Sequence, residues 1–394
     1  MTASTSSRLP SLSGEEAQHS RAVRALIQER IRAHGGWLDF EVFMDLALYA
    51  PGLGYYSAGT AKLGSGGDFV TAPELSNIFS ACVARQCAEI LAATSGSEIL
   101  EFGAGTARMA EAVLEQLARL DALPERYFIL EVSADLKARQ QERIARLPPA
   151  LAARVVWLDT WPVRPIRGVL LANEILDALP CRRFAVRASG LHAVGVVTAA
   201  DGTFSELERP ADAMLREEVA AIVEGLPEPL APGYRSEICP RAGAWVAGAA
   251  QCLARGALLI FDYGLPRAHY YHPERHEGTL RCHFRQLAHD DPYVNVGLQD
   301  ITAWVDFTRL GRAADGCGLD VLGFCTQAAF LLGTGIDALA DPDADALSRA
   351  RWASEARQLL LPGEMGEAFK VMALGRGVDT PLRGFAYQDL RYSL

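Results

Sequence analysis

Residues 99–106, Ile-Leu-Glu-Phe-Gly-Ala-Gly-Thr, constrain the fold of this chain more than any other segment. An apolar run leads into a carboxylate and two glycines, and a second apolar run ends at Glu131. With a helix between them, these runs are typical of one βαβ unit of a parallel sheet. Such a unit binds a nucleoside-bearing cofactor at the carboxyl ends of its strands.

The chemistry of the glycine turn discriminates between cofactors. A dinucleotide fingerprint has a third glycine close to the pyrophosphate, and Arg108 occupies that position here. Glu101 stands before the first glycine, where a negative charge favours a cationic amino-acid cofactor over a pyrophosphate. S-adenosylmethionine is therefore the predicted cofactor, and a nucleotide-dependent oxidoreductase is the weaker rival.

Each part of this unit has an expected role in binding. Gly103 and Gly105 let the backbone approach the amino-acid half of the cofactor, where a side chain would clash. Glu101 can meet the ammonium group, and Glu131 can accept hydrogen bonds from both ribose hydroxyls. Thr106 in the turn is a further predicted contact. The alternative is a structural turn with incidental acids.

The end of the third predicted strand is where adenine usually lies in such folds. Asp159 follows this strand between Trp157 and Trp161, and we predict it as a cofactor contact. Either tryptophan could contact adenine there or pack in the core.

Alternating strand and helix patterns predict a parallel sheet covered on both faces. We expect strands over residues 98–102, 127–131, 155–158, 168–172, 257–262, 319–324 and 368–374. Helices are expected over residues 15–34, 40–49, 73–93, 109–120, 134–146, 216–224 and 242–255. The pattern over residues 184–197 predicts an antiparallel pair of strands outside the parallel sheet. Residues 265–308 lack periodicity and predict an excursion over the active site.

Residues 171–180, Leu-Ala-Asn-Glu-Ile-Leu-Asp-Ala-Leu-Pro, follow the fourth strand, beside the expected place of the cofactor's reactive group. Methyl transfer needs an aligned nucleophile and removal of its proton. Glu174 and Asp177 could face the same way if the turn is helical. We predict both as catalytic, together with Asn173. The alternative is a helix N-terminus with favourable acids.

Composition narrows the functional classes. The chain has 394 residues, a formal net charge of −10 and a pI near 5.4. Nucleic-acid binders usually present a basic face, so no nucleic-acid partner is expected. Acidic pockets favour a cationic substrate. The chain has no apolar run of about eighteen residues, so no membrane span is expected.

Three further features bear on location and metals. Eight cysteines without a C-x-x-C pair are typical of reduced thiols in a cytosolic protein. Five histidines lie between residues 269 and 289, but Pro273 interrupts their helical spacing, so no metal site is predicted. Residues 1–14 are rich in Ser and Thr, and this composition indicates a disordered leader. A cytoplasmic location is favoured, and a mitochondrial one stays open.

Several motifs in one order resemble the MidA-like methyltransferases, a family that includes the arginine methyltransferase of mitochondrial complex I assembly. The motifs are Gly-Tyr-Tyr at 54–56, Gly-Asp-Phe-Val-Thr-Ala-Pro-Glu at 67–74, Asn-Glu-Ile-Leu-Asp-Ala-Leu-Pro at 173–180, Phe-Asp-Tyr-Gly at 261–264 and Val-Gly-Leu-Gln-Asp at 296–300. The resemblance covers about residues 35–374.

The resemblance implies a class I methyltransferase (Rossmann-like) α/β fold. Its sheet is seven-stranded and mostly parallel, with an N-terminal helical cap and insertions. We expect the leader over residues 1–14, the cap region over 15–94 and the methyltransferase domain over 95–394. Insertions are expected near residues 184–240 and 265–312.

The resemblance also carries over to single residues. Family cofactor positions match Gly103, Gly105 and Glu131, and the family motif after the fourth strand matches Asn173, Glu174 and Asp177. The segment at 67–71 is implied to fold against the open side of the cofactor, through Asp68 and Thr71. The family more often has glycine where this chain has Ala107, and alanine fits there if its φ is negative.

The combined prediction is an S-adenosylmethionine-dependent methyltransferase that modifies a protein nitrogen, with arginine the acceptor that the resemblance implies. A protein substrate is the expected partner, and a homodimer is compatible with the long insertions. Two alternatives remain. The acceptor could be a small molecule, or the chain could be a cofactor-binding assembly factor with weak or lost catalysis.

Overall fold

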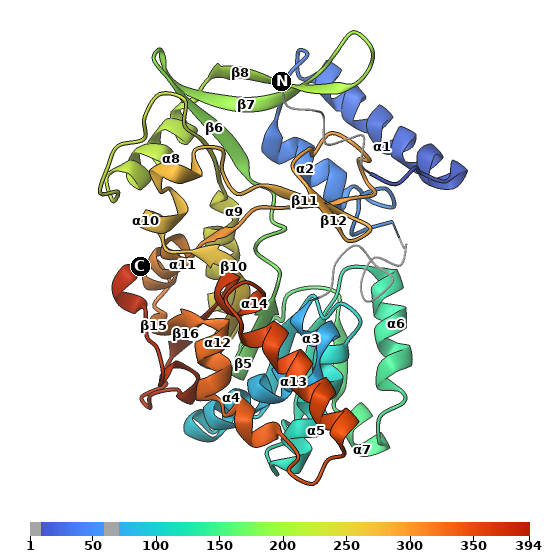
Figure 1. Ribbon diagram of the computed structural model, residues 1–394, viewed down its shortest axis with the longest axis vertical. Coiled ribbons are helices and arrows are strands. Elements are labelled where there is room, and N and C mark those ends of the chain that lie inside the picture. Colours follow the sequence, from blue (N-terminus) through green and yellow to red (C-terminus); the bar gives the residue numbers. More distant parts are fainter. Residues whose placement is uncertain (1–8, 59–70) are drawn as a thin grey trace.

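The computed structural model describes residues 9–58 and 71–394. A large sheet with its helices forms the lower part of the molecule in Figure 1, and smaller sheets with α1 and α2 form the upper part. None of the helices in the described ranges is both long and apolar enough to cross a membrane.

The large sheet has the strand order of a class I methyltransferase. Seven strands run in the order β15-β16-β10-β5-β2-β3-β4, and β14 (Val305–Asp306) pairs with β10. The seven are β2 (Glu98–Phe102), β3 (Arg126–Leu130), β4 (Val155–Leu158), β5 (Ile166–Asn173), β10 (Leu253–Leu265), β15 (Asp320–Thr326) and β16 (Phe369–Arg376). Only β16 runs antiparallel to its neighbours in this row. The mostly parallel seven-stranded prediction is confirmed.

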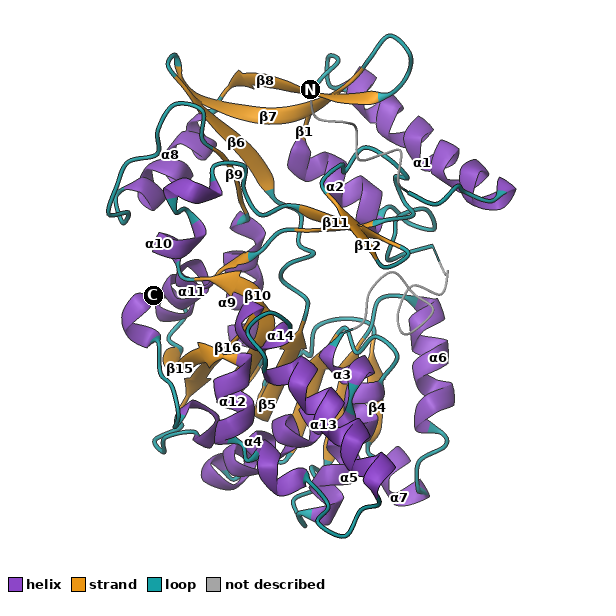
Figure 2. Cartoon of the chain, viewed as in Figure 1, coloured by secondary structure: helices purple, strands orange, loops and turns teal. Residues whose placement is uncertain are grey.

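Helices cover both faces of this sheet, as Figure 2 shows. One apolar cluster joins the sheet to α4 (Asn77–Thr94), α5 (Arg108–Arg119), α12 (Gln327–Gly333) and α13 (Ala346–Leu360). The other cluster joins it to α9 (Pro240–Gln251) and α11 (Phe307–Gly316). Short helices α7 (Pro149–Ala152) and α14 (Met365–Ala368) and the longer α6 (Ala134–Ile144) complete this part. Burial on both faces explains why the strands read as continuous apolar runs.

The helix expected over residues 73–93 is two helices, α3 (Ala72–Leu75) and α4. Ser76 between them is extended, and its hydroxyl accepts a hydrogen bond from the backbone N–H of Ile78 at 3.1 Å. This contact is an N-cap, so the serine begins a new helix where periodicity alone predicts a continuous one.

The helix expected over residues 242–255 ends earlier, at Gln251. Leu253 already pairs with Ile166 and begins β10. Pairing with β5 draws this segment into the sheet, so tertiary packing overrides the helical propensity of the last residues.

The upper part is built around an antiparallel sheet. Its strands are β1 (Leu38–Asp39), β6 (Arg182–Arg187), β7 (Gly190–Thr198), β8 (Phe204–Pro210) and β9 (Arg235–Ile238). The pair predicted over residues 184–197 is confirmed as β6 and β7. Helices α1 (Gly14–Ala33), α2 (Phe40–Tyr49) and α8 (Ala213–Val223) accompany it. Residues 15–94, which were expected to form one cap region, are divided between the two parts of the molecule. Helices α1 and α2 lie in the upper part, and α4 packs on the large sheet.

The segment expected as an excursion over the active site has structure of its own. It forms α10 (Arg267–Tyr270) and a small sheet of β11 (Arg281–Phe284), β12 (Leu287–His289) and β13 (Asp300–Thr302). Cys282 and Ile301 of this sheet pack in one apolar cluster with Phe43 of α2. Contact with α1 and α2 therefore holds the segment in the upper part.

Candidate active site

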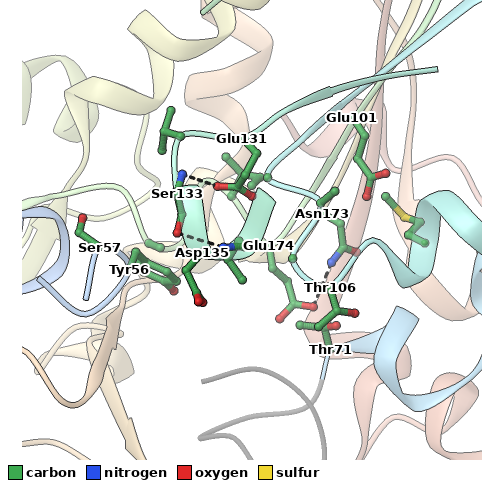
Figure 3. A pocket seen from close by; sticks show the side chains of 18 of the residues that line it. Tyr56, Ser57, Thr71, Glu101, Thr106, Glu131, Ser133, Asp135, Asn173 and Glu174 are labelled. Atoms are coloured by element: carbon green, nitrogen blue, oxygen red, sulfur yellow. Dashed lines mark hydrogen bonds between the residues drawn. The ribbon is translucent and has the colours of Figure 1, made fainter. Parts of the chain in front are cut away.

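The large pocket of this molecule opens at the carboxyl ends of β2, β3 and β5, where the strand order reverses. Its volume is about 850 Å³, within the range of small-molecule sites. The glycine turn, the start of α6, residues 49–57 and the turn after β5 all contribute to its lining. Figure 3 shows Tyr56 and Ser57 on the side away from Glu101.

The turn between β2 and α5 exposes backbone to the pocket. Gly103 has φ +58° and Gly105 has φ +54°, a region that favours glycine. A Cβ added at Gly103 would lie 2.6 Å from the Cδ1 of Ile175. Ala107 has φ +62°, so the condition of a negative φ under which alanine was expected to fit is not met. This residue is the N-cap of α5, and the tight entry into the helix imposes the left-handed conformation.

Glu101 is buried beneath this turn, with 2 % of its surface exposed, yet its side chain lines the pocket. The hydroxyl of Tyr127 donates to its Oε2 atom at 2.6 Å. Burial raises the pKa of Glu101 to about 7. A cation in the pocket would favour its ionised form.

Both oxygens of Glu131 are held in place at the end of β3. The backbone N–H of Ser133 donates to Oε1 and the amide of Gln140 donates to Oε2, each at 2.9 Å. Gln140 also donates to the carbonyl of Gly105 at 3.0 Å, so one side chain ties the glycine turn to this acid. The remaining lone pairs of Glu131 can accept ribose hydroxyls, the role expected from the sequence.

Asp159 lies outside the pocket lining. Its carboxylate is largely exposed and pairs with Lys137 of α6 at 2.7 Å. Trp157 donates to Gln140 at 3.0 Å and so acts only through that residue. Trp161 packs against Phe102. The geometry therefore gives no support to the predicted cofactor contact of Asp159.

Sequence reasoning missed the apolar surface next to Glu131. Val132 lines the pocket and is 86 % exposed, so its apolar side chain is open to a ligand there. Such a surface fits one face of an adenine ring. The only signal in the sequence is its position directly after the strand-ending acid.

The turn after β5 is not helical. The prediction that Glu174 and Asp177 face the same way depended on a helical turn at this position. Glu174 has φ +52°, and its backbone N–H donates to the carbonyl of Phe261 at 2.9 Å. Glu174 lines the pocket, and Asn173 donates to its Oε1 atom at 3.2 Å. Asp177 is buried and is not among the lining residues. The two acids are neighbours, but only Glu174 faces the cavity.

Four carboxyls gather near the turn after β5, and we call Glu174, Asp177, Asp262 and Asp300 the carboxyl cluster. Burial raises the pKa of Glu174 and of Asp177 well above their ordinary values, and neighbouring carboxyls of the cluster raise them further. Burial raises the pKa of Asp262 to about 8. The cluster is therefore poised to receive a positive charge.

Two aromatic residues for which no role was predicted also line the pocket. The rings of Tyr49 and Tyr56 are stacked with centroids 5.5 Å apart and an interplanar angle of 18°. Tyr56 belongs to the Gly-Tyr-Tyr motif, which marked the family resemblance but carried no assigned role.

The segment before α4 also reaches the site. Thr71 lines the pocket, and Thr106 of the glycine turn donates a hydrogen bond to Glu74 of α3. Glu74 is a further lining residue that sequence reasoning missed. Asp68, predicted as a cofactor contact, lies outside the described residues.

The lining fits a cationic cofactor with an anionic end. Its acidic side chains in the described ranges are Glu74, Glu101, Glu131, Asp135 and Glu174, and its basic side chain is Arg108. S-adenosylmethionine carries a sulfonium, an ammonium and one carboxylate, so this balance suits it and disfavours a pyrophosphate. No three His, Cys, Asp or Glu side chains in the described ranges lie together as metal ligands.

Sheet order, glycine turn and strand-ending acid together define a class I S-adenosylmethionine-dependent methyltransferase. The chain belongs to the family described as "putative S-adenosyl-L-methionine-dependent methyltransferase", whose model matches residues 82–325. S-adenosylmethionine is the cofactor of this enzyme, and the oxidoreductase alternative is wrong.

Curated relatives and solved structures agree with this assignment. The chain is 29 % identical over 375 residues to the mitochondrial protein arginine methyltransferase NDUFAF7 of Danio rerio, covering 86 % of this chain and 83 % of the relative. Identity to the human protein of that name is 27 %, covering 84 % and 78 %. A Burkholderia thailandensis protein, crystallised with S-adenosylhomocysteine, is 42 % identical with a TM-score of 0.93, covering 98 % of this chain and all of that one.

Proposed function

We propose that this enzyme transfers methyl groups from S-adenosylmethionine to an arginine nitrogen of a protein. The observation that carries the proposal is the carboxyl cluster near the turn after β5. Burial and neighbouring carboxyls raise the pKa of these acids and so favour their neutral form, and a guanidinium, which stays protonated at neutral pH, would favour their ionised form. The names of the curated relatives support the same acceptor.

Glu174 is the group that we assign to the acceptor's proton. When bound, S-adenosylmethionine supplies a methyl carbon on a positively charged sulfur, and transfer breaks that bond as the N–C bond forms. The guanidinium nitrogen then gives up one proton, so that the methylated product remains a singly charged guanidinium. Glu174 lines the pocket and can accept this proton in its ionised form, while Asn173 holds its Oε1 atom.

The remaining members of the site have supporting roles in this proposal. Asp177 adds negative charge from behind the pocket wall. We assign Glu131 to the ribose, Glu101 to the ammonium group, and Gly103 and Gly105 to the close backbone approach. Thr71 and Thr106 border the amino-acid end of the cofactor.

The test is incubation of the enzyme with methyl-labelled S-adenosylmethionine and two protein pools from cells that lack the enzyme. One pool is untreated, and in the other the arginines are blocked with a dicarbonyl reagent. Label in the untreated pool that the blocking removes, mapped to arginine by mass spectrometry, supports the proposal. Label that survives blocking, or that appears only in small molecules, contradicts it.

Other attributes of the enzyme remain proposals. A small-molecule acceptor, or an assembly role with weak catalysis, predicts no arginine label in that test. We propose a cytoplasmic location, although the curated relatives are named as mitochondrial proteins. Fractionation of cells that express a tagged chain would test this location. The proposed boundaries are a leader over residues 1–14, a cap region over 15–94 and a methyltransferase domain over 95–394, with insertions near 184–240 and 265–312. We also propose a homodimer, which sedimentation would test.

A further inference from the structure

We propose that Tyr56 is the residue that selects a planar cation as the acceptor, with Tyr49 stacked beside it and Asp300 holding it in place. We call the two rings the tyrosine wall. This inference rests on the proposed arginine acceptor and names the surface that would recognise it.

The tyrosine wall is a fixed surface. Tyr55 meets Tyr56 edge to face, with centroids 5.0 Å apart and an interplanar angle of 84°. The near-parallel stack with Tyr49 restrains the same ring further, so that it cannot swing freely. Both rings line the same pocket as Glu174.

Both phenol protons are committed elsewhere. The hydroxyl of Tyr56 donates to Oδ1 of Asp300 at 2.9 Å, and that of Tyr49 donates to the carbonyl of Ala178 at 2.9 Å. Burial and nearby carboxyls raise the pKa of both tyrosines, so both stay neutral. A ligand in the pocket therefore meets ring surface, not a free hydroxyl donor.

The hydrogen bond to Asp300 increases the attraction of the Tyr56 ring for a cation. A phenol that donates to a carboxylate carries more electron density on its ring, which strengthens the attraction between the ring and a cation. The backbone N–H of Ile301 donates to the same Oδ1 atom at 3.0 Å and helps to fix it. Tyr49, Tyr56 and Glu174 all line one pocket, so a ligand bound there can meet both the rings and the acid.

This geometry discriminates between cationic side chains. A guanidinium is flat, weakly hydrated and able to stack on a ring while it points N–H groups at a carboxylate. A lysine ammonium is compact and strongly hydrated and gains less from the same surface. A neutral isostere of arginine, such as citrulline, gains neither the ring attraction nor the charge of the carboxyl cluster.

The experiment measures binding of acetyl-arginine amide, acetyl-lysine amide and acetyl-citrulline amide to the enzyme saturated with S-adenosylhomocysteine. The unmutated enzyme is compared with Tyr56→Leu and Tyr56→Phe, and with Tyr387→Leu, which removes an exposed ring elsewhere. We expect the arginine probe to bind best. Its affinity should fall at least about fivefold in Tyr56→Leu, change less in Tyr56→Phe and stay unchanged in Tyr387→Leu.

Asp300→Asn tests the positioning role separately. Asparagine retains an oxygen that accepts from Tyr56 but removes the charge, so we expect an intermediate loss for the arginine probe and none for citrulline. Affinity for S-adenosylhomocysteine should be unchanged in all variants. Saturation-transfer spectra on the unmutated enzyme need no variant to fold, and the Cδ protons of arginine should receive magnetisation from tyrosine ring protons.

The outcomes separate the two proposals. If the unmutated enzyme binds the arginine probe and Tyr56→Leu binds it equally well, or if no transfer from tyrosine rings is seen, the tyrosine wall is overturned while the arginine acceptor stands. If the unmutated enzyme binds lysine or citrulline as well as arginine, or none of the three, the arginine acceptor itself is contradicted.

Discussion

Oδ2 of Asp262 accepts a hydrogen bond from the backbone N–H of Leu176 at 2.9 Å, although the two residues are 86 positions apart in the chain. The same oxygen lies 3.4 Å from the backbone nitrogen of Asp177, which also donates to it. Through these bonds the end of β10 holds the turn that presents Glu174 to the pocket. Asp262 is thus a positioning residue.

Replacing Asp262 by alanine should therefore disturb both stability and catalysis. Asp262→Ala leaves the buried N–H groups of Leu176 and Asp177 without their acceptor, and we expect the free energy of unfolding to fall by about 2 kcal/mol or more. Asp262→Asn keeps an acceptor oxygen and should lose less. Denaturant titration measures both, with Asp320→Ala at the exposed start of β15 as the control. An Asp262→Ala variant as stable as the control would contradict this role.

Gly103→Val should abolish cofactor binding. A Cβ at this position would lie 2.6 Å from Ile175, and a β-branched residue is strained at φ +58°. We expect calorimetry to find saturable binding of S-adenosylmethionine to the unmutated enzyme, none of NAD, and none of either to the variant. Gly243→Ala, in helix α9 with its Cβ 3.6 Å from Ala313, should bind normally. Retained binding by a folded Gly103→Val would refute the assignment of this turn.

Affinity for S-adenosylmethionine should rise with pH through neutrality. The pKa of Glu101 is raised to about 7, so below that pH the carboxyl must lose a proton before it can meet the ammonium group. The dependence approaches tenfold per pH unit on the acid side and levels off above about pH 8. Titrations between pH 5.5 and about 9 in Glu101→Gln should lose most of this slope, and in the exposed control Glu142→Gln should keep it.

The same raised pKa has a consequence for the enzyme without cofactor. A carboxyl whose pKa is higher in the folded than in the unfolded state binds more protons when folded. Its contribution to stability is present at low pH and is lost as the pH rises through its folded value. For Glu101 and Asp262 that window runs from their ordinary pKa values of 4.5 and 3.8 up to their folded values of about 7 and about 8. We expect the melting temperature to fall across it, less steeply with S-adenosylhomocysteine bound. A rising melting temperature would contradict the raised pKa values of these buried acids.

Glu174→Gln should separate proton transfer from binding. The amide keeps the size of the side chain but cannot accept the acceptor's proton, and we expect kcat to fall at least about 100-fold with unchanged cofactor affinity. Asp177→Asn should reduce kcat less, because Asp177 does not line the pocket. Single-turnover assays with a methyl acceptor found in the arginine test measure both. Equal losses in the two variants would mean that the cluster acts as one unit and that Glu174 has no special role.

Much of the cofactor half of the site could be predicted because its signals are local. An apolar run followed by Glu131, and glycines at positions 103 and 105, are read within one βαβ unit. The pocket brings these residues together with Glu101 as expected. The left-handed conformation of Ala107 was not predictable in this way, because helix entry imposes it and alanine does not favour it.

Local signals in the sequence predicted the strands of the large sheet, the cofactor class and the acids at the strand ends, because periodicity and turn chemistry act over a few residues. Only the tertiary structure decided that Glu174 faces the pocket while Asp177 lies behind it, since Asp262 and Phe261 of a distant strand hold that turn. It likewise decided that Tyr56 joins the pocket, through a bond to Asp300 across 244 positions of the chain. Contacts between residues so far apart depend on packing of the whole fold and leave no periodic signal in the sequence.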